Sequence, residues 1–137
     1  MMAFMPPPVP IGVGAAYRGR FGVHLELFAR GRVVIVPTGI GVARGCTYPA
    51  RTREPTGVIE VLRGAHLTLG DLFRLWQKPL DRTQLLGFRG RVLAFVGGKR
   101  FRGDPRTIAL ARHAEIVLEI GGYVPPHRSY LFAKGPS

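Results

Sequence analysis

Cysteine, serine and acidic residues are scarce in this chain of 137 residues. The single cysteine, Cys46, excludes an internal disulfide framework and any zinc site built on several cysteines. The only serines, Ser129 and Ser137, lie close to the C-terminal end, which disfavours a serine nucleophile. The chain also lacks a glycine-rich phosphate loop, a Gly-x-Ser-x-Gly motif and a His-Glu-x-x-His motif. We therefore expect no enzyme and no cofactor.

The charge balance is one-sided. Eight acidic residues stand against 20 basic ones, which gives a formal net charge of +12 at pH 7. Only three of the basic residues are lysines, so the charge is almost entirely guanidinium, a group that holds phosphates and carboxylates in bidentate geometry. Such a charge favours an anionic partner. The charge alone also leaves open an origin in genome composition or a hot habitat.

Apolar segments that contain proline flank the middle of the chain. Residues 1–17 carry no charged side chain, and residues 123–137 combine prolines with aromatic rings. Prolines exclude a transmembrane helix in residues 1–17, which also lack the basic start and unbroken apolar core of a signal peptide. We expect both segments to be extended arms, mostly uncovered by the domain's own core, that dock on a partner. The residues expected to make these contacts are Phe4, Tyr17, Tyr123, Tyr130 and Phe132.

The middle of the chain, residues 18–122, has the pattern of one domain. Apolar residues alternate with others along several stretches, which predicts β-strands. These stretches are residues 23–28, 32–36, 57–62, 91–96, 99–102 and 115–120. Tight turns at Arg30-Gly31 and Gly97-Gly98 join two of the pairs into hairpins.

One segment predicts a helix instead. Leucines and aromatic residues recur at helical spacing over about residues 68–77. Thr68 and Asp71 have the spacing of a capping box, and Pro79 closes the element. We expect an α+β fold with a mixed β-sheet and one short amphipathic helix, in a β-grasp-like arrangement. The alternative is a small open barrel or sandwich in which the helix plugs one end.

Several short motifs follow one another in a fixed order between residues 20 and 133. They are residues 23–28, 36–41, Cys46, residues 56–61, residues 68–73 with Trp76, Pro79 and Leu80, Gly98-Lys99, residues 103–106 and His113. In this order the motifs resemble an uncharacterised family of bacterial extracytoplasmic domains. The resemblance implies a related fold and a location outside the cytoplasm, and it supplies no function.

The chain departs from that family at its histidines. Members typically carry alternating histidines up to the His-Leu pair and a Leu-His-Thr-His-Asp motif after the cysteine, which together look like a transition-metal site. This chain keeps only His24 and has Arg51 and Arg53 at the histidine positions of the second motif. A guanidinium cannot ligate a metal, because it stays protonated and has no free lone pair. The other histidines show no ligand spacing, so we expect no metal.

By analogy with the family, Arg20, Arg51 and Arg53 should lie near His24 and form an anion- or partner-binding site. Three neighbouring guanidiniums repel one another, so we expect a carboxylate, a partner acid or a bound anion within hydrogen-bond reach. Glu54 is the nearest acid in the sequence. The opposing interpretation is that the site has decayed and the arginines point into water.

Our leading expectation is a non-enzymatic, extracytoplasmic binding or structural domain. It would dock on a larger partner or assembly, such as another protein, a homo-oligomer or an anionic polymer, through its arms and an arginine-rich surface. The first alternative is a nucleic-acid-binding protein, in which exposed rings such as Tyr48 and Phe88 stack among the basic residues. The second is a metal-binding domain or metal-dependent enzyme, which the replacement of histidine by arginine disfavours.

Overall fold

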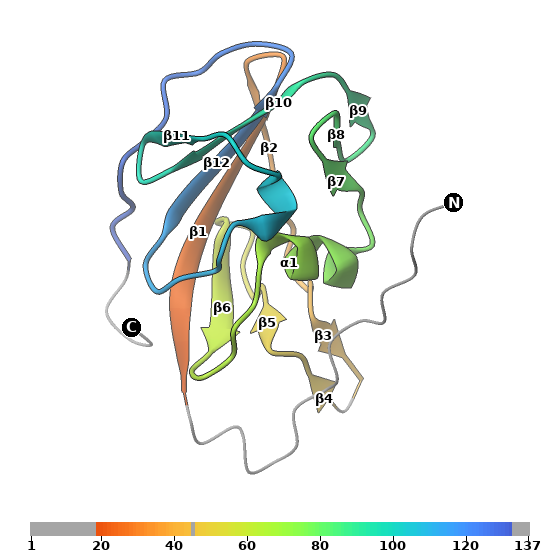
Figure 1. Ribbon diagram of the computed structural model, residues 1–137. Coiled ribbons are helices and arrows are strands. Elements are labelled where there is room, and N and C mark those ends of the chain that lie inside the picture. The colour runs from red at the N-terminus through yellow and green to blue at the C-terminus, as the bar shows by residue number, and fades with distance from the viewer. Residues whose placement is uncertain (1–18, 45, 133–137) are drawn as a thin grey trace.

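The computed structural model describes residues 19–44 and 46–132 (Figure 1). These described residues form twelve strands and one α-helix, with a short 3-10 helix at Pro105–Thr107. The elements are β1 (Arg20–Ala29), β2 (Arg32–Val34), β3 (Val42–Ala43), β4 (Cys46–Thr47), β5 (Ala50–Arg51), β6 (Val58–Leu62), α1 (Leu69–Trp76), β7 (Leu80–Asp81), β8 (Gln84–Leu85), β9 (Phe88–Arg89), β10 (Val92–Val96), β11 (Lys99–Phe101) and β12 (Glu115–Ile120). Among the described residues, no helix is long and apolar enough to cross a membrane.

The long strand β1 organises a mixed main sheet of seven strands. The strand order is β11-β10-β12-β1-β6-β5, and β2 pairs with the end of β1. β1 runs parallel to the last strand, β12, and antiparallel to β6 and β2. The predictions of an α+β class and a mixed sheet are therefore confirmed. Two small additional sheets, β3-β4 and β7-β8-β9, have strands of only two residues each.

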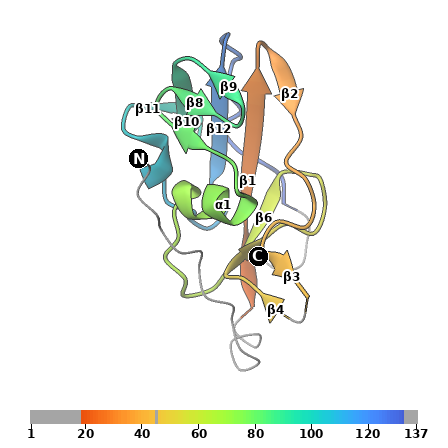
Figure 2. The ribbon, with the colours of Figure 1, turned by 90° about the vertical axis from the view of Figure 1, so that its right-hand side faces the viewer.

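The helix packs on one face of the main sheet (Figure 2). Thr68 and Asp71 form the expected capping box, and the helix ends at Gln77 in the left-handed conformation, within a residue of the predicted bounds. Leu72 and Phe73 are buried in one cluster with alternate residues of β1, such as Leu25. Apolar area removed from water on this face is the main stabilising contribution to the fold.

The opposite face of the sheet is covered by the chain's own C-terminal part. After β12, residues 123–132 run without regular secondary structure, on the left of Figure 1. Val124 packs on a small cluster of Phe28, Phe95 and Val117, and its N–H donates to Glu119 Oε1 at 2.9 Å. The segment therefore contacts the domain at these points, and most of residues 123–132 are exposed. Residues 1–17, with Phe4 and Tyr17, and residues 133–137 lie outside the described residues.

Candidate functional site

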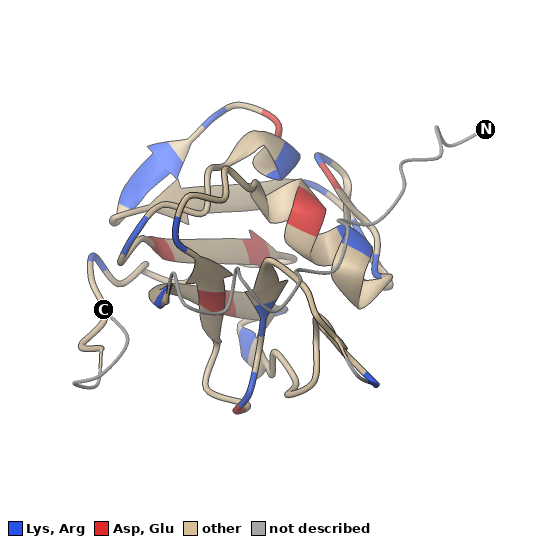
Figure 3. Ribbon diagram, turned by 90° about the horizontal axis from the view of Figure 1, so that it is seen from below, with Lys and Arg blue, Asp and Glu red and all other residues tan. Residues whose placement is uncertain are grey.

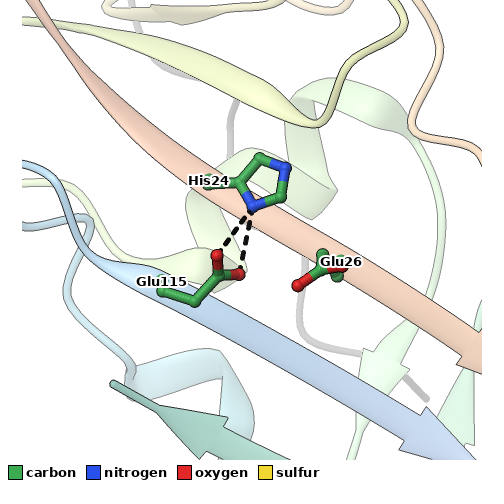
Figure 4. Close-up of side chains that lie close together, drawn as sticks. All are labelled: His24, Glu26 and Glu115. Atoms are coloured by element: carbon green, nitrogen blue, oxygen red, sulfur yellow. Dashed lines mark hydrogen bonds and ion pairs between the residues drawn. The ribbon is translucent and has the colours of Figure 1, made fainter. Parts of the chain in front are cut away.

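Three ionisable side chains converge on the sheet face that lies away from α1. His24 and Glu26 are two residues apart on β1, so both point to the same face, and Glu115 on β12 lies opposite His24 in the parallel register. Figure 4 shows the three side chains directed toward one another. One ligand atom from each lies within 4.8 Å of the other two. The fold thus brings together groups that are up to 91 residues apart in the sequence.

His24 is fixed at both ring nitrogens. Its Nε2 lies 3.0 Å from the carbonyl oxygen of Thr56, which can only accept, so Nε2 carries a proton and donates it. Its Nδ1 faces the carboxylate of Glu115, at 2.9 Å and 3.1 Å from the two oxygens. Both side chains are buried, at 8% exposure for His24 and 1% for Glu115. Because Nε2 already carries a proton, the close contact at Nδ1 requires a second proton that His24 and Glu115 share in this buried site.

Burial raises the pKa of Glu115 above its ordinary value, and the neighbouring carboxylate of Glu26 raises it further, while His24 opposes both effects. Glu26 has a second partner on the C-terminal segment: His127 Nδ1 lies 2.8 Å from Glu26 Oε2. This bond raises the pKa of His127, whose side chain is 67% exposed. The site therefore contains two carboxylates flanked by two imidazoles, with one imidazole open to solvent.

Aromatic rings of the C-terminal segment shield the site. Tyr130 stacks on the His24 ring with centroids 3.6 Å apart and planes 14° apart. Phe132 meets Tyr130 edge-on and stacks on the ring of His113, with centroids 4.5 Å apart. Tyr130 covers the face of the imidazole and not its edge, so Nδ1 stays directed at the carboxylates. Three of the five expected partner contacts thus contact this chain itself: Tyr130, Phe132 and Tyr123, whose ring lies against that of Phe95.

Two of the expected arginines, Arg51 and Arg53, pair with an acid other than Glu54. Arg51 Nε donates to Glu60 Oε1 at 2.9 Å, and Arg53 donates to Glu60 Oε2 at 2.6 Å. Burial alone would raise the pKa of Glu60, but these two hydrogen bonds hold it below its ordinary value. The carboxylate that we expected near the arginines is therefore Glu60, and Glu54 is exposed.

Arg20 has a structural role beside this ion pair. Its guanidinium donates to the backbone carbonyls of Tyr48, Pro49 and Glu60, between 2.8 and 3.2 Å. Burial, and then the charge of Arg51, lower its pKa to about 10. The arginines thus neutralise Glu60 and satisfy carbonyls, and the hydrogen-bond partners of His24 are Glu115 and Thr56. Figure 3 shows the basic positions (blue) spread over the outside of the fold and several acidic positions (red) on the strands.

Sequence reasoning missed three of the four residues at the histidine site. Glu26 and Glu115 have the pattern of acids on a solvated strand face, and His127 lies in the segment interpreted as a free arm. One feature could have pointed to Glu26: it shares a strand face with His24, and the residues on the other face of that strand are buried. Nothing in the local pattern identifies β12 as the parallel neighbour of β1.

No model of a protein family matches the chain, and no curated protein or solved structure matches it either. The resemblance to extracytoplasmic domains accordingly stays a prediction.

Proposed function

We propose that this protein is a non-enzymatic binding domain that holds one divalent transition-metal ion. The ligands would be His24 Nδ1, one oxygen each of Glu26 and Glu115, and His127 Nδ1. The observation that carries the proposal is the convergence of three ligand atoms within 4.8 Å on one buried sheet face. The prediction of no metal rests on the histidines and arginines alone and leaves out the carboxylates of Glu26 and Glu115.

The second contact of His24 supports this assignment. Metal-ligating histidines almost always donate their other ring N–H to a carbonyl or carboxylate, which fixes the tautomer and the ring orientation. Here Nε2 donates to the Thr56 carbonyl, so the tautomer that leaves the Nδ1 lone pair available is the favoured neutral form. A metal ion would then replace the proton shared between His24 and Glu115. Two carboxylates would neutralise its double charge.

The donor set and the spacing suit zinc or a similar ion. Zinc binds histidine nitrogen and carboxylate oxygen at about 2.0–2.1 Å, so tetrahedral ligand atoms lie roughly 3.4 Å apart. The ligand atoms of His24, Glu26 and Glu115 now spread over up to 4.8 Å, and Glu26 is only partly buried, so its carboxylate has room to move toward the other two. His127 is the solvent-facing ligand and therefore marks the side from which an ion would enter.

The test is metal binding by the full chain without a purification tag. Isothermal titration with Zn²⁺ and the visible spectrum of bound Co²⁺ should each give one site per chain. Glu26→Gln keeps the size of the side chain and removes its charge, and His24→Ala removes a ligand; each should weaken binding at least tenfold, the usual scale for the loss of a ligand or its support.

His66→Ala is the matched control, because His66 is an exposed histidine outside the cluster. Circular dichroism of every variant establishes that the fold is intact. Binding that survives in both site variants, or that His66→Ala weakens equally, would show that the metal lies elsewhere and would reject the proposal.

Our proposal also includes two expectations from the sequence, a β-grasp-like arrangement and docking on a partner. The parallel pairing of the first and last strands, with one helix on a single face, supports a β-grasp-like arrangement. The protein would also dock on a protein partner or a second copy, and exposed apolar side chains such as Val33 and Ile35 support this. A location outside the cytoplasm rests on the family resemblance. Native mass spectrometry of the full chain tests the second copy directly.

A further inference from the structure

A basic groove crosses one end of the main sheet, away from the histidine site. It consists of two adjoining hollows of about 370 and 410 Å³ that share Arg89 and Gly121. Its walls come from the end of β1, from β9 and the turn before β10, and from the turn after β12. Its charged and aromatic lining consists of Arg30, Phe88, Arg89, Arg91, Glu119 and Tyr123.

Three arginines in the groove keep their charge uncompensated. Among the described residues, Arg30, Arg89 and Arg91 form no ion pair. Four other described arginines, Arg51, Arg53, Arg74 and Arg106, do form ion pairs with carboxylates. In a chain with a net charge of +12, an unpaired cluster in a concave surface concentrates the positive potential there.

An exposed aromatic ring lines each hollow. Phe88 is 37% exposed in one and Tyr123 is 64% exposed in the other. The Tyr123 ring is supported from within the domain by Phe95, at a centroid distance of 6.0 Å. A ring held on one side and open on the other is a stacking platform, because ordering it for a ligand costs little conformational entropy.

Glycines let a ligand approach the backbone between these rings. Gly121 and Gly122 have φ of 75° and 154°, which side chains with a Cβ rarely adopt, and Gly87 has no atom within 4 Å of where a Cβ would lie. The one acid that lines the groove, Glu119, has no solvent exposure, and burial raises its pKa toward the neutral form. Because a neutral carboxyl does not repel an anion, the raised pKa reduces the repulsion between Glu119 and an anion in the groove.

We propose that this groove binds single-stranded nucleic acid. Phosphates would lie on the guanidiniums of Arg30, Arg89 and Arg91, and bases would stack on Phe88 and Tyr123. Two adjoining hollows, each with a ring and with an arginine shared between them, fit a chain that repeats base and phosphate. The proposal is independent of metal binding, because no residue of the metal site lines the groove.

The experiment measures fluorescence anisotropy of labelled oligothymidine and oligouridine with the full chain at several salt concentrations. Arg89→Gln/Arg91→Gln should weaken binding at least tenfold. The salt slope should fall by about 1.4, because each lost phosphate contact removes about 0.7 from it for a single strand. Arg102→Gln/Arg112→Gln removes the same charge from two exposed positions outside the groove and should change affinity far less.

A second pair of variants separates nucleic acid from any other polyanion. Phe88→Leu and Tyr123→Leu keep apolar bulk but lose a stacking surface, and each should weaken oligonucleotide binding roughly tenfold. Inorganic polyphosphate, which has no bases, should bind the two variants and the parent equally.

The proposal is wrong if both arginine pairs weaken binding equally, which would indicate a diffuse field, or if the leucine variants bind oligonucleotide as well as the parent. Absence of oligonucleotide binding at low salt would also reject it.

Discussion

The absence of a side chain at Gly22 provides the space that the ring of Phe132 occupies. A Cβ at residue 22 would lie 2.8 Å from two carbons of that ring, closer than real Cβ contacts come. Gly22 has no positive φ, so the backbone itself does not require glycine. The glycine instead allows the C-terminal segment to lie close to β1 beside the histidine site.

Gly22→Ala should therefore displace Phe132 and loosen the C-terminal segment. We expect a fall of about 1–3 kcal/mol in the free energy of unfolding, the usual cost of overpacking, measured by urea denaturation. Gly87→Ala is the control, because a Cβ there meets open space. In a Phe132→Ala background, Gly22→Ala should cost nothing further; an equal cost in both backgrounds would contradict this explanation.

Tyr130 and its neighbour Leu131 offer a matched pair of truncations. Tyr130 stacks on the buried His24 ring, whereas Leu131 is 94% exposed. Tyr130→Ala should lower the free energy of unfolding by about 1–2 kcal/mol, because it removes a ring contact and its apolar area, and Leu131→Ala should have no measurable effect. Thermal denaturation of the two variants checks this. Equal melting temperatures would mean that the segment does not pack on the domain in solution.

The sequence predicts the main sheet well because one face of it is buried. Alternation along β1 and β12 and the capping box at Thr68 are local signals. The helix and β12 lie within a residue of their predicted bounds, and β1 begins three residues earlier than predicted. The strands of two residues, β3 to β5 and β7 to β9, are too short to show a periodicity. β5 joins the main sheet by pairing with β6, which local patterns do not encode.

The histidine site is far less predictable, because its parts meet only through non-local pairing. The register that sets His24 opposite Glu115 joins the first and last strands of the described chain. The acids at residues 26 and 115 alternate with apolar residues as expected on a solvent-exposed face of a strand. That face is covered only because the C-terminal segment packs on it. That segment has the composition of a free arm, and its docking depends on a space at Gly22 that a side chain would fill.

The ion pairs of Glu60 predict a pH-dependent contribution to stability. Its pKa is lowered in the folded protein, so the contribution is present above the unfolded value of about 4.3 and is lost as the pH falls through the folded value. Glu60→Gln should lower the free energy of unfolding by about 2 kcal/mol at pH 7, because Arg51 and Arg53 lose a charged partner. Urea denaturation should show the difference from the parent shrinking below about pH 4.

Glu54→Gln is the control for this prediction, since Glu54 is exposed and makes no ion pair among the described residues. A loss of stability at Glu60→Gln that stays constant from pH 7 to pH 3 would contradict an electrostatic origin, and would indicate a change in packing.

Glu119 should have the opposite pH dependence. Its side chain is fully buried, its Oε1 accepts the N–H of Val124, and its Oε2 has no hydrogen-bond partner. Burial raises its pKa in the folded protein, so its contribution to stability is fully present below the unfolded value of about 4.3 and is lost as the pH rises through the folded value. Above the folded value the folded state bears the cost of a buried, incompletely solvated charge.

Glu119→Gln should relieve that cost while keeping an acceptor for Val124. We expect the variant to be more stable than the parent by about 1 kcal/mol at pH 8 and no more stable near pH 4, where the parent carboxyl is protonated. Urea denaturation across this range measures both limits, with Glu54→Gln again as the exposed control. A variant less stable than the parent at pH 8 would contradict the prediction, because it would show that the ionised carboxylate costs less there than a neutral amide.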